Sequence, residues 1–413
     1  QLKSPHCRFC GNTPVIRPTE HFFLDLPKLS DRLRDWLKDK SYWRPNVLNF
    51  ARNLLEAGLQ ARPITRDIEW GVPVPVAGFE KKVIYVWFEA VIGYLSATIE
   101  WAQIIGEEER WREWWQQPGR SYYFMAKDNI WFHTIIWPAM LMGYGNLNLP
   151  YDVPANEFLN LEGQKFSSSK NWAVWLPDYL SRYAPDPLRY VLTATMPETN
   201  DSDFSWREFV RRNNDELVAT YGNVVHRVLT FAYRRFGGEV PKPSRLGPQD
   251  TEILDTIANA FVTVGRNIGE CRFRAALAEA MAAAQALNRY LDAVAPWNTF
   301  ARNREAAATS IYVALRAIDS LKTLFYPFLP FSSQALHEML GYKGTIMGRQ
   351  YIQEIAEGEV THLVLRYDGS KNVGSWAPSQ LPVGQKLRPP KPLFAKLDES
   401  IIEEELARLG RKG

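Results

Sequence analysis

Residues 82–94 read Lys82-Val-Ile-Tyr-Val-Trp-Phe-Glu-Ala-Val-Ile-Gly-Tyr94, and residues 122–133 read Tyr122-Tyr-Phe-Met-Ala-Lys-Asp-Asn-Ile-Trp-Phe-His133. Each stretch opens on β-branched and aromatic residues, which predicts a buried strand leading into a helix. Alternating strands and helices form a parallel sheet, whose ligands bind beyond the carboxyl ends of the strands. We therefore predict an α/β fold with a ligand site at two strand ends, formed by Trp87, Glu89, Tyr94, Lys127, Asp128 and His133.

A second polar segment, Leu161-Glu-Gly-Gln-Lys-Phe-Ser-Ser-Ser-Lys170, brings two lysines, three serines and a glycine together. Such loops bind polyphosphate, because glycine permits close backbone approach, hydroxyls donate hydrogen bonds and lysines neutralise charge. The alternative is a solvated, serine-rich turn. The candidate phosphate-binding residues are Gly163, Lys165, Ser167, Ser168 and Lys170.

The bulk properties exclude several classes of protein. A net charge of +3 over 413 residues predicts no partner by itself, so any nucleic-acid surface must be local. Three cysteines are too few for a disulfide framework, which suits a reducing cytosol. We find no run of about twenty apolar residues and no signal peptide, so we expect a cytosolic protein without a membrane span. The chain opens on Gln1 without an initiator methionine, which suggests the interior of a longer protein or a separate subunit.

Cys7 and Cys10 form a Cys-x-x-Cys knuckle that can hold one zinc ion between two thiolates. A complete site needs four ligands. His6 and His21 are possible donors, but we expect two further cysteines upstream of Gln1. The alternative is a pair of reduced surface thiols, since one such knuckle is only half of a zinc signature.

From Arg207 onward the apolar residues repeat at helical spacing, which predicts a helical bundle joined to the α/β domain by a polar turn at 201–206. Asn223 and Arg227 lie one helical turn apart, and Trp297 follows a proline at a helix break. Amide, guanidinium and aromatic groups are what single-stranded RNA loops require. The alternative for this arginine-rich helix is a solvated face.

We divide the chain into five parts. They are the end of an insertion with the zinc knuckle (1–62), the second half of a catalytic α/β domain (63–155), the phosphate loop and a stem-contact region (156–206), an RNA-binding helical domain (207–345) and a C-terminal extension that packs back on the body (346–413). Prolines at 378, 382, 389, 390 and 392 predict that the tail from Thr361 begins as an extended connector.

The loop at 165–170 resembles the Lys-Met-Ser-Lys-Ser signature of class I aminoacyl-tRNA synthetases. Residues 85–94 and 126–133 resemble Tyr-Val-Trp-Phe-Asp-Ala-x-Ile-Gly-Tyr and Gly-Lys-Asp-x-x-x-Phe-His of the methionyl enzymes in particular. The chain departs from these motifs at Glu89, Ala126 and Ser168, and it carries a lysine at 170 instead. The resemblance implies the second half of a class I Rossmann-type parallel sheet, followed by an all-α anticodon-binding bundle.

The resemblance also implies a reaction: methionine and ATP form methionyl-adenylate, and the methionyl group then moves to tRNA(Met), with Mg²⁺ on the phosphates. A thioether side chain is polarizable and is well held by aromatic rings. Carried over by position, the residues that line the methionine side are Trp87, Ala90, Val91, Tyr94, Asn129, His133 and Trp137. The residues implied for ATP are Lys127, Asp128 on the ribose, Gly163 and Lys165, and those implied for the anticodon are Asn223, Arg227 and Trp297. Taken singly, an aromatic residue of this kind lies in the core more often than in a pocket.

Class I enzymes also carry a His-Ile-Gly-His motif, and no such tetrapeptide occurs in this chain. We therefore expect this motif and the first half of the sheet upstream, or on a separate N-terminal chain. The rivals are an isoleucyl, valyl or leucyl enzyme, against which the aromatic set argues, and a non-catalytic tRNA-binding protein, against which the phosphate loop argues.

Overall fold

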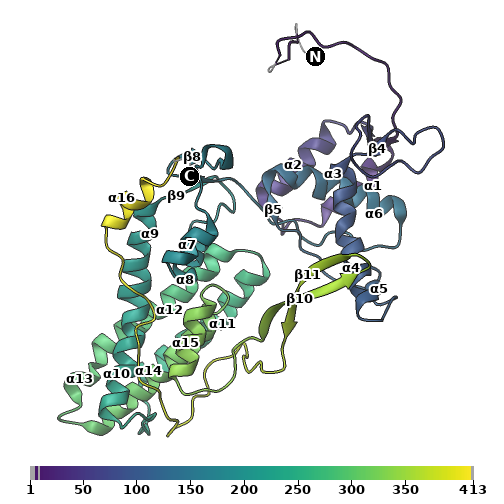
Figure 1. Cartoon of the computed structure of the whole chain (residues 1–413). Helices are drawn as coiled ribbons and strands as arrows, with labels where there is room; N and C mark the ends of the chain where they lie inside the picture. Colours follow the sequence, from purple (N-terminus) through teal and green to yellow (C-terminus); the bar gives the residue numbers. More distant parts are fainter. Residues whose placement is uncertain (1–4, 8–9, 411–413) are drawn as a thin grey trace. The chain divides into compact units, whose positions relative to one another are not determined.

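The computed structural model describes residues 5–7 and 10–410, and the chain forms two units, 1–156 and 157–413 (Figure 1). The first unit contains helices around several short strands. Its elements are β1 (Phe23–Leu24), η1 (Leu26–Leu29), α1 (Ser30–Lys38), α2 (Pro45–Glu56), β2 (Arg62–Pro63), β3 (Thr65–Arg66), β4 (Val83–Ile84), α3 (Val86–Glu89), η2 (Ala90–Ile92), α4 (Gly93–Ile104), α5 (Trp111–Trp115), β5 (Met125–Ala126), η3 (Lys127–Asn129), η4 (Phe132–Ile136), α6 (Trp137–Tyr144) and β6 (Ala155–Asn156).

Parallel pairing occurs at the second of the two predicted strands. Strand β5 pairs in parallel with β6, and Tyr122 forms a further parallel bridge with Asp152. The core beneath this pair contains Ile130, Ile135 and Val153, all buried. A parallel strand before the turn and helix is therefore confirmed, although β5 covers only Met125–Ala126 and Tyr122 adds a single bridge.

The strand predicted at the start of 82–94 is much shorter than expected. Strand β4 covers two residues and pairs antiparallel with β3, and helical structure begins at Val86. The prediction was wrong for residues 86–88 because a short apolar run cannot be told from a helix by its periodicity. The consequence matters for the site: Trp87, Ala90 and Tyr94 lie on successive helical turns, and Trp87 is 49% exposed rather than buried.

The second unit begins with a small sheet and two short helices and continues into the bundle. Its elements are β7 (Leu159–Leu161), β8 (Gln164–Lys165), η5 (Ser168–Lys170), α7 (Leu176–Arg182), α8 (Pro185–Ala194), β9 (Ser202–Phe204), α9 (Trp206–Arg212), η6 (Asn213–Gly222), α10 (Asn223–Arg235), α11 (Pro248–Gly269), α12 (Phe273–Val294), α13 (Pro296–Thr299), α14 (Arg304–Phe325), α15 (Pro330–Met339), β10 (Arg349–Glu357), β11 (Val360–Asp368) and α16 (Ser400–Leu406). Strand β7 pairs in parallel with β9 and antiparallel with β8.

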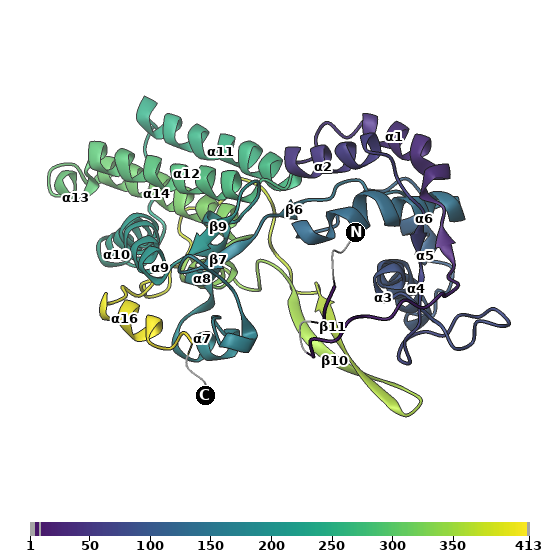
Figure 2. The same cartoon turned by 90° about the horizontal axis from the view of Figure 1, so that it is seen from above.

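The helices α10, α11, α12 and α14 lie side by side, as Figures 1 and 2 both show, which confirms the predicted bundle. Each buries one apolar stripe in a shared core: Val224 and Val228 on α10, Ile257 and Phe261 on α11, and Leu321 on α14. Alanines of α12, including Ala280, Ala283 and Ala284, are also buried, and their small side chains permit close packing of the helices.

The tail differs from the predicted connector. Residues 349–368 form a hairpin, β10 and β11, with nine paired positions. In both views it stands apart from the bundle (Figures 1 and 2). The runs of β-branched and aromatic residues on either side of Gly358 were a hairpin signal that the prolines further along obscured. After the hairpin the tail packs on the bundle, where Phe394 is buried and the carbonyl oxygen of Ala395 accepts a hydrogen bond from Asn213.

Candidate active site

The aromatic residues predicted for the ligand site form one cluster in the first unit. Tyr94, at the start of α4, and His133, in η4, are joined by a hydrogen bond of 2.8 Å between the hydroxyl and Nε2. Trp137, at the start of α6, lies 6.3 Å from Tyr94 between ring centroids. Trp87, on α3, stacks on Phe132 at 5.5 Å. These four side chains come from four separate elements. The fold brings Tyr94, His133 and Trp137 together, and Trp87 joins them through Phe132.

The hydrogen bonds of His133 fix its protonation. Its Nδ1 lies 3.0 Å from the carbonyl oxygen of Asn129, which can only accept, so Nδ1 carries the proton. In the neutral ring Nε2 is then the acceptor, and the Tyr94 hydroxyl donates to it. Burial lowers the pKa of His133 below its ordinary value of 6.5, against a smaller opposite effect of the Asn129 hydrogen bond. Burial likewise raises the pKa of Tyr94. Both side chains are therefore uncharged at neutral pH.

The other residues predicted for the methionine and ATP sites lie in the short helical turns η2 and η3. Ala90 is exposed and Val91 is buried in η2, Asn129 is half-buried, and Asp128 is exposed in η3, directly after the end of β5. Lys127, beside Asp128, is half-buried. A carboxylate at a strand end of this kind is accessible to a hydroxyl-bearing ligand.

The predicted phosphate loop lies in the second unit and projects from the hairpin of β7 and β8. Glu162 and Gly163 form the turn with φ of 50° and 73°, so Gly163 is needed for the turn itself. Its backbone N–H donates to the carboxylate of Asp203 at 2.7 Å. Lys165 is exposed, with Nζ 5.5 Å from the centre of the Phe158 ring.

Two backbone hydrogen bonds of 2.9 Å between Ser167 and Trp172 close the tip of this loop. Between them Ser168, Ser169 and Lys170 form a single exposed 3₁₀ turn. The Trp172 indole donates to the carbonyl oxygen of Leu161 at 2.9 Å, which anchors the tip to β7. The two lysines thus lie on opposite arms of one short loop that presents hydroxyls and cations to solvent.

The three residues predicted to read RNA also lie together, at one end of the bundle. Asn223 opens α10 and is exposed, and Arg227 follows one turn later. The Arg227 guanidinium lies 4.2 Å from the Trp297 ring centre and 3.9 Å from Asp292. Helix α12 ends at Val294, Ala295 adopts a left-handed conformation, and Pro296 starts α13, so the predicted helix break before Trp297 is present. Elsewhere Arg211 and Arg212 pair with Glu208 and Glu216, as a solvated face would.

Comparison with known proteins agrees with this arrangement. Residues 1–229 match the family described as class I tRNA synthetases (M), and residues 240–362 match the anticodon-binding domain of methionyl-tRNA ligase. The methionine–tRNA ligase of Thermomicrobium roseum is 56% identical over 412 residues, covering 99% of this chain and 70% of that protein. The chain belongs to the methionyl-tRNA synthetase family. These are class I aminoacyl-tRNA synthetases, which are ligases.

Further relatives of the methionyl-tRNA synthetase family are equally clear. The methionine–tRNA ligase of Roseiflexus castenholzii is 54% identical, covering 100% of this chain and 71% of that protein. Among solved structures, Mycobacterium tuberculosis methionyl-tRNA synthetase bound by methionyl-adenylate matches with a TM-score of 0.76 and 24% identity, covering 94% of this chain and 72% of that one. The structural match supports the fold: a class I catalytic domain with a parallel sheet, followed by a helical anticodon-binding domain.

The zinc knuckle is not completed by the residues that the structure describes. Cys7 and Cys10 are exposed, and within 5–7 and 10–410 no group of three or more His, Cys, Asp or Glu is placed to hold a metal ion. His21 is engaged elsewhere, with Nδ1 2.9 Å from the Thr65 hydroxyl and Nε2 3.6 Å from Asp67. The described residues alone therefore complete no zinc site.

Among the described helices none is long and apolar enough to cross a membrane.

Sequence reasoning missed the second layer behind the aromatic cluster. Trp115 lies edge-on to Trp137 at 5.9 Å and donates its indole N–H to Thr98. Tyr123 accepts a hydrogen bond from the Trp137 indole at 3.1 Å. The only signal for Tyr123 was its place in the motif-bearing strand, two residues from Met125, where alternation turns it toward the core.

Proposed function

We propose that the chain carries the methionine, ATP and tRNA contacts of a methionine–tRNA ligase. In the first step the methionine carboxylate attacks the α-phosphate of ATP, giving methionyl-adenylate and pyrophosphate. In the second step the methionyl group passes to the terminal ribose of tRNA(Met). The observation that carries the proposal is the aromatic cluster centred on the Tyr94–His133 hydrogen bond, in a chain 56% identical to a methionine–tRNA ligase.

The cluster suits a thioether for a chemical reason. A methionine side chain is apolar and polarizable, and sulfur packs favourably against the edges and faces of aromatic rings. Tyr94 and His133 are both uncharged in this setting, so the wall they form stays apolar at neutral pH. Trp87 and Trp137 supply large aromatic rings, and Ala90 adds a small, exposed side chain. Asp128 is the candidate partner of the ribose hydroxyls. The methyl group of Ala126 makes the wall near the nucleotide bulkier than the family's glycine would.

The loop at 163–170 is the candidate clamp for the phosphates. Lys165 and Lys170 supply charge, and Ser167 and Ser168 supply hydroxyl donors, which favours the pyrophosphate leaving group as negative charge develops on it. The triphosphate would enter with Mg²⁺ on its oxygens, which adds to this charge neutralisation. We assign Gly163 to shaping the turn. Its backbone N–H already donates to the Asp203 carboxylate, so a contact between Gly163 and ATP stays a proposal.

The end of the bundle is the candidate anticodon site. Asn223 offers an amide for a base edge, and the stacked pair of Arg227 and Trp297 offers a flat surface for a base. The half-buried Trp297 is already held by an edge-on contact with Phe231, with 6.5 Å between the two ring centroids. An ordered platform loses little conformational entropy when RNA binds.

Replacing Trp297 by alanine is expected to weaken binding of tRNA(Met) by about 1–3 kcal/mol, because one base loses its stacking partner. Methionine-dependent ATP–pyrophosphate exchange should stay close to wild type. The measurement is tRNA affinity at fixed salt, beside exchange and thermal unfolding. Trp376→Ala is the matched control, since that half-exposed indole contacts Phe261 instead of Arg227. Equal losses of RNA binding and exchange would mean that Trp297 only supports the fold.

The lowered pKa of His133 predicts how methionine binding depends on pH. Because the ring stays neutral to below pH 6.5, methionine affinity should be constant between pH 8 and 6.5. Below that range the protonated Nε2 can no longer accept from Tyr94, and affinity should fall. Methionine titrations across pH 5–8 check this, with Tyr94→Phe as the control that removes the hydroxyl. A fall already between pH 8 and 7 would contradict the neutral pair.

The function itself is tested by methionine-dependent ATP–pyrophosphate exchange and by charging of tRNA(Met). Both activities are measured on the complete gene product, which is the whole protein that the gene encodes. Both are also measured on the 413-residue chain alone. We propose that the reaction needs the His-Ile-Gly-His segment, supplied upstream or by a second chain, since the clamp otherwise contacts the triphosphate from one side. Exchange supported by isoleucine or valine rather than methionine would overturn the proposal.

We place this reaction in the cytoplasm, where charged tRNA is used. We propose that Cys7 and Cys10 supply part of a zinc site, as their Cys-x-x-Cys spacing suggests. A zinc ion on Cys7 and Cys10 would require ligands beyond those residues.

A further inference from the structure

One buried residue contacts three of the four aromatic side chains assigned to methionine. The ring of Tyr123 lies edge-on to Tyr94 at 5.0 Å and tilted against His133 at 5.7 Å. Its hydroxyl accepts the indole N–H of Trp137 at 3.1 Å. Tyr123 is 6% exposed, about as buried as His133 at 5%, and it contacts all three side chains at once.

Tyr123 is itself held rigidly. Its backbone N–H donates to the carbonyl oxygen of Asp152 at 3.0 Å, within the parallel pairing that leads into β5. Its neighbour Tyr122 turns the other way along the strand and packs on Tyr151 at 5.3 Å. Burial raises the pKa of the Tyr123 hydroxyl, which therefore keeps its proton at any physiological pH. The strand thus presents a fixed ring to the back of the cluster.

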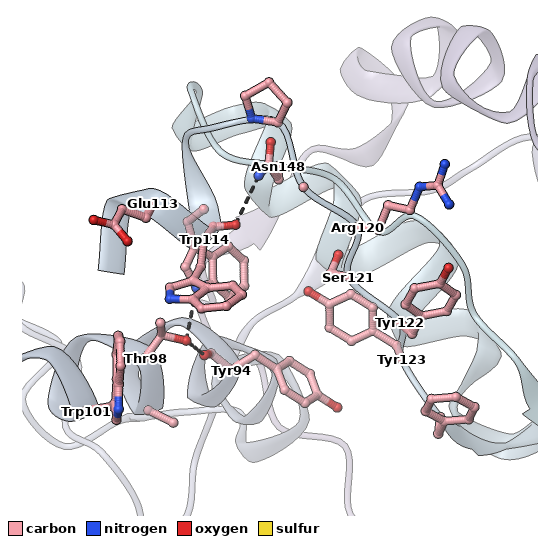
Figure 3. Close-up of a pocket in the computed structure, with 15 residues that line it drawn as sticks. Tyr94, Thr98, Trp101, Glu113, Trp114, Arg120, Ser121, Tyr122, Tyr123 and Asn148 are labelled. Carbon is pink, nitrogen blue, oxygen red and sulfur yellow. Dashed lines mark hydrogen bonds between the residues drawn. The ribbon is translucent and has the colours of Figure 1, made fainter. Parts of the chain in front are cut away.

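Tyr94 depends on this contact because its side chain also borders an open cavity. A cavity of about 710 Å³ lies beside it, lined by Tyr94 and Tyr123 together with Thr98, Trp101, Trp114 and Trp115. Figure 3 shows Tyr94 and Tyr123 converging at this cavity from helix α4 and from the strand. Tyr94 is 44% exposed, so packing alone does not fix its ring. Without the Tyr123 ring, the Tyr94 side chain has room to turn away from His133.

We propose that Tyr123 is a positioning residue for methionine selection: it holds Tyr94, His133 and Trp137 in the arrangement that receives the thioether. The inference rests on the proposed methionine site. Tyr123 acts through the three residues in front of it. Its ring fixes Tyr94 and His133, and its hydroxyl satisfies the buried N–H of Trp137, which would otherwise have no partner there.

Two substitutions separate the two contributions. Tyr123→Leu removes the ring and keeps an apolar filler, whereas Tyr123→Phe keeps the ring and removes only the acceptor of Trp137. In the complete gene product, we expect Tyr123→Leu to raise the methionine KM about 10-fold, as loss of two ring contacts implies. The ATP KM should change less than about 2-fold, because the nucleotide contacts lie elsewhere. Tyr123→Phe should give a smaller rise in the same direction.

The decisive readout is selectivity between methionine and norleucine, which replaces sulfur by a methylene of similar size. If Tyr123 places the rings around sulfur, Tyr123→Leu should reduce the methionine-to-norleucine ratio of kcat/KM by about 2- to 10-fold. Tyr122→Leu, on the other face of the same strand, should leave the ratio unchanged. Thermal unfolding shows which variants are folded.

The outcomes that overturn the inference are distinct from failure of the proposed function. Equal losses with methionine and norleucine, or equal rises in the methionine and ATP KM values, would make Tyr123 a fold residue only. If Tyr123→Leu does not fold, an unchanged selectivity ratio in Tyr123→Phe together with an unchanged methionine KM overturns it instead. Absence of methionine-dependent exchange in the unmutated complete gene product would instead defeat the proposed function.

Discussion

Replacing Lys165 by alanine in the complete gene product is expected to lower the turnover of methionine-dependent ATP–pyrophosphate exchange by about 10²–10³-fold, the usual effect of losing one well-placed transition-state partner. The methionine KM should change little. A phosphate clamp acts mainly as charge develops on the leaving group, so its loss appears in kcat rather than in ground-state binding.

The geometry of the loop supports this assignment to Lys165. It is exposed on β8, and its backbone pairs with Asn160 of β7, so the base of the side chain is fixed. Lys170 lies at the far arm, in the 3₁₀ turn closed by Ser167 and Trp172. A lysine rooted in a strand is better preorganised than one on a single exposed turn.

Lys170→Ala decides which lysine replaces the one that the family has at the position of Ser168. A fall in kcat comparable to that of Lys165→Ala would mean that Lys170 has taken over this role, and no change would leave Lys165 as the principal cation. Lys371→Ala, an exposed lysine of the tail, is the control for general loss of positive charge. A methionine KM that rises while kcat is preserved in Lys165→Ala would contradict the clamp.

The sequence predicted the α/β class and the helical bundle, while the roles of the site residues stay predictions. Tyr94, His133 and Trp137 were assigned together from the aromatic residues of two motifs, and the structure brings these three side chains together. The sequence could not predict that β4 runs antiparallel to its neighbour. Only two residues of β4 pair with β3, and a short apolar run is compatible with a helix as well as a strand.

Individual contacts between segments far apart in the sequence could not be predicted for a different reason. Tyr123 looks like any core tyrosine until the positions of Tyr94 and Trp137 are known. The hairpin of β10 and β11 was missed because proline content was weighed over alternation. Its apolar residues Ile352, Leu363 and Leu365 share one face and are all more than half exposed. They therefore belong to no core, and a search for core residues does not find them. The packing of the tail on the body was expected, but its individual contacts, such as Asn213 with Ala395, join side chains far apart in sequence.

That attachment includes a buried charged network in the second unit. The Lys322 ammonium lies 2.6 Å from Asp319 Oδ1 and 3.2 Å from His337 Nδ1. The other carboxylate oxygen accepts hydrogen bonds from the hydroxyls of Tyr342 and Ser379. Asp319, Lys322, His337 and Ser379 are each at most 6% exposed. Ser379 belongs to the tail, so Asp319 joins the tail to α14 and α15.

Each partner in this network depends on the Asp319 carboxylate. Burial, and to a lesser extent the charge of Lys322, lower the pKa of His337 below its ordinary value, so the ring is neutral and accepts from the ammonium. Lys322 also lies 4.3 Å from the Tyr342 ring centre. Without Asp319 the ammonium would keep only these two neutral partners, and two buried hydroxyls would lose their acceptor.

We therefore expect Asp319→Ala to lower the free energy of unfolding of the second unit by about 3–5 kcal/mol, the usual effect of leaving a buried charge without its partner. The matched control is Asp35→Ala. Asp35 pairs with Lys38 at the same spacing and the same 2.6 Å, but both side chains are at least 70% exposed. That change should leave the free energy of unfolding almost unchanged, because solvent screens an exposed pair.

The double variant Asp319→Ala/Lys322→Met separates the charge from the hydrogen bonds. Removing both charges should recover a large part of the loss, because an apolar side chain then replaces the unpaired ammonium. The part that remains belongs to the hydroxyls of Tyr342 and Ser379, and so to the tail. Urea unfolding of the two single variants and the double variant gives the coupling directly. If Asp319→Ala unfolds as easily as Asp35→Ala, the network contributes no more than a surface pair, and the tail must be held by its apolar contacts at Leu381, Leu387 and Phe394.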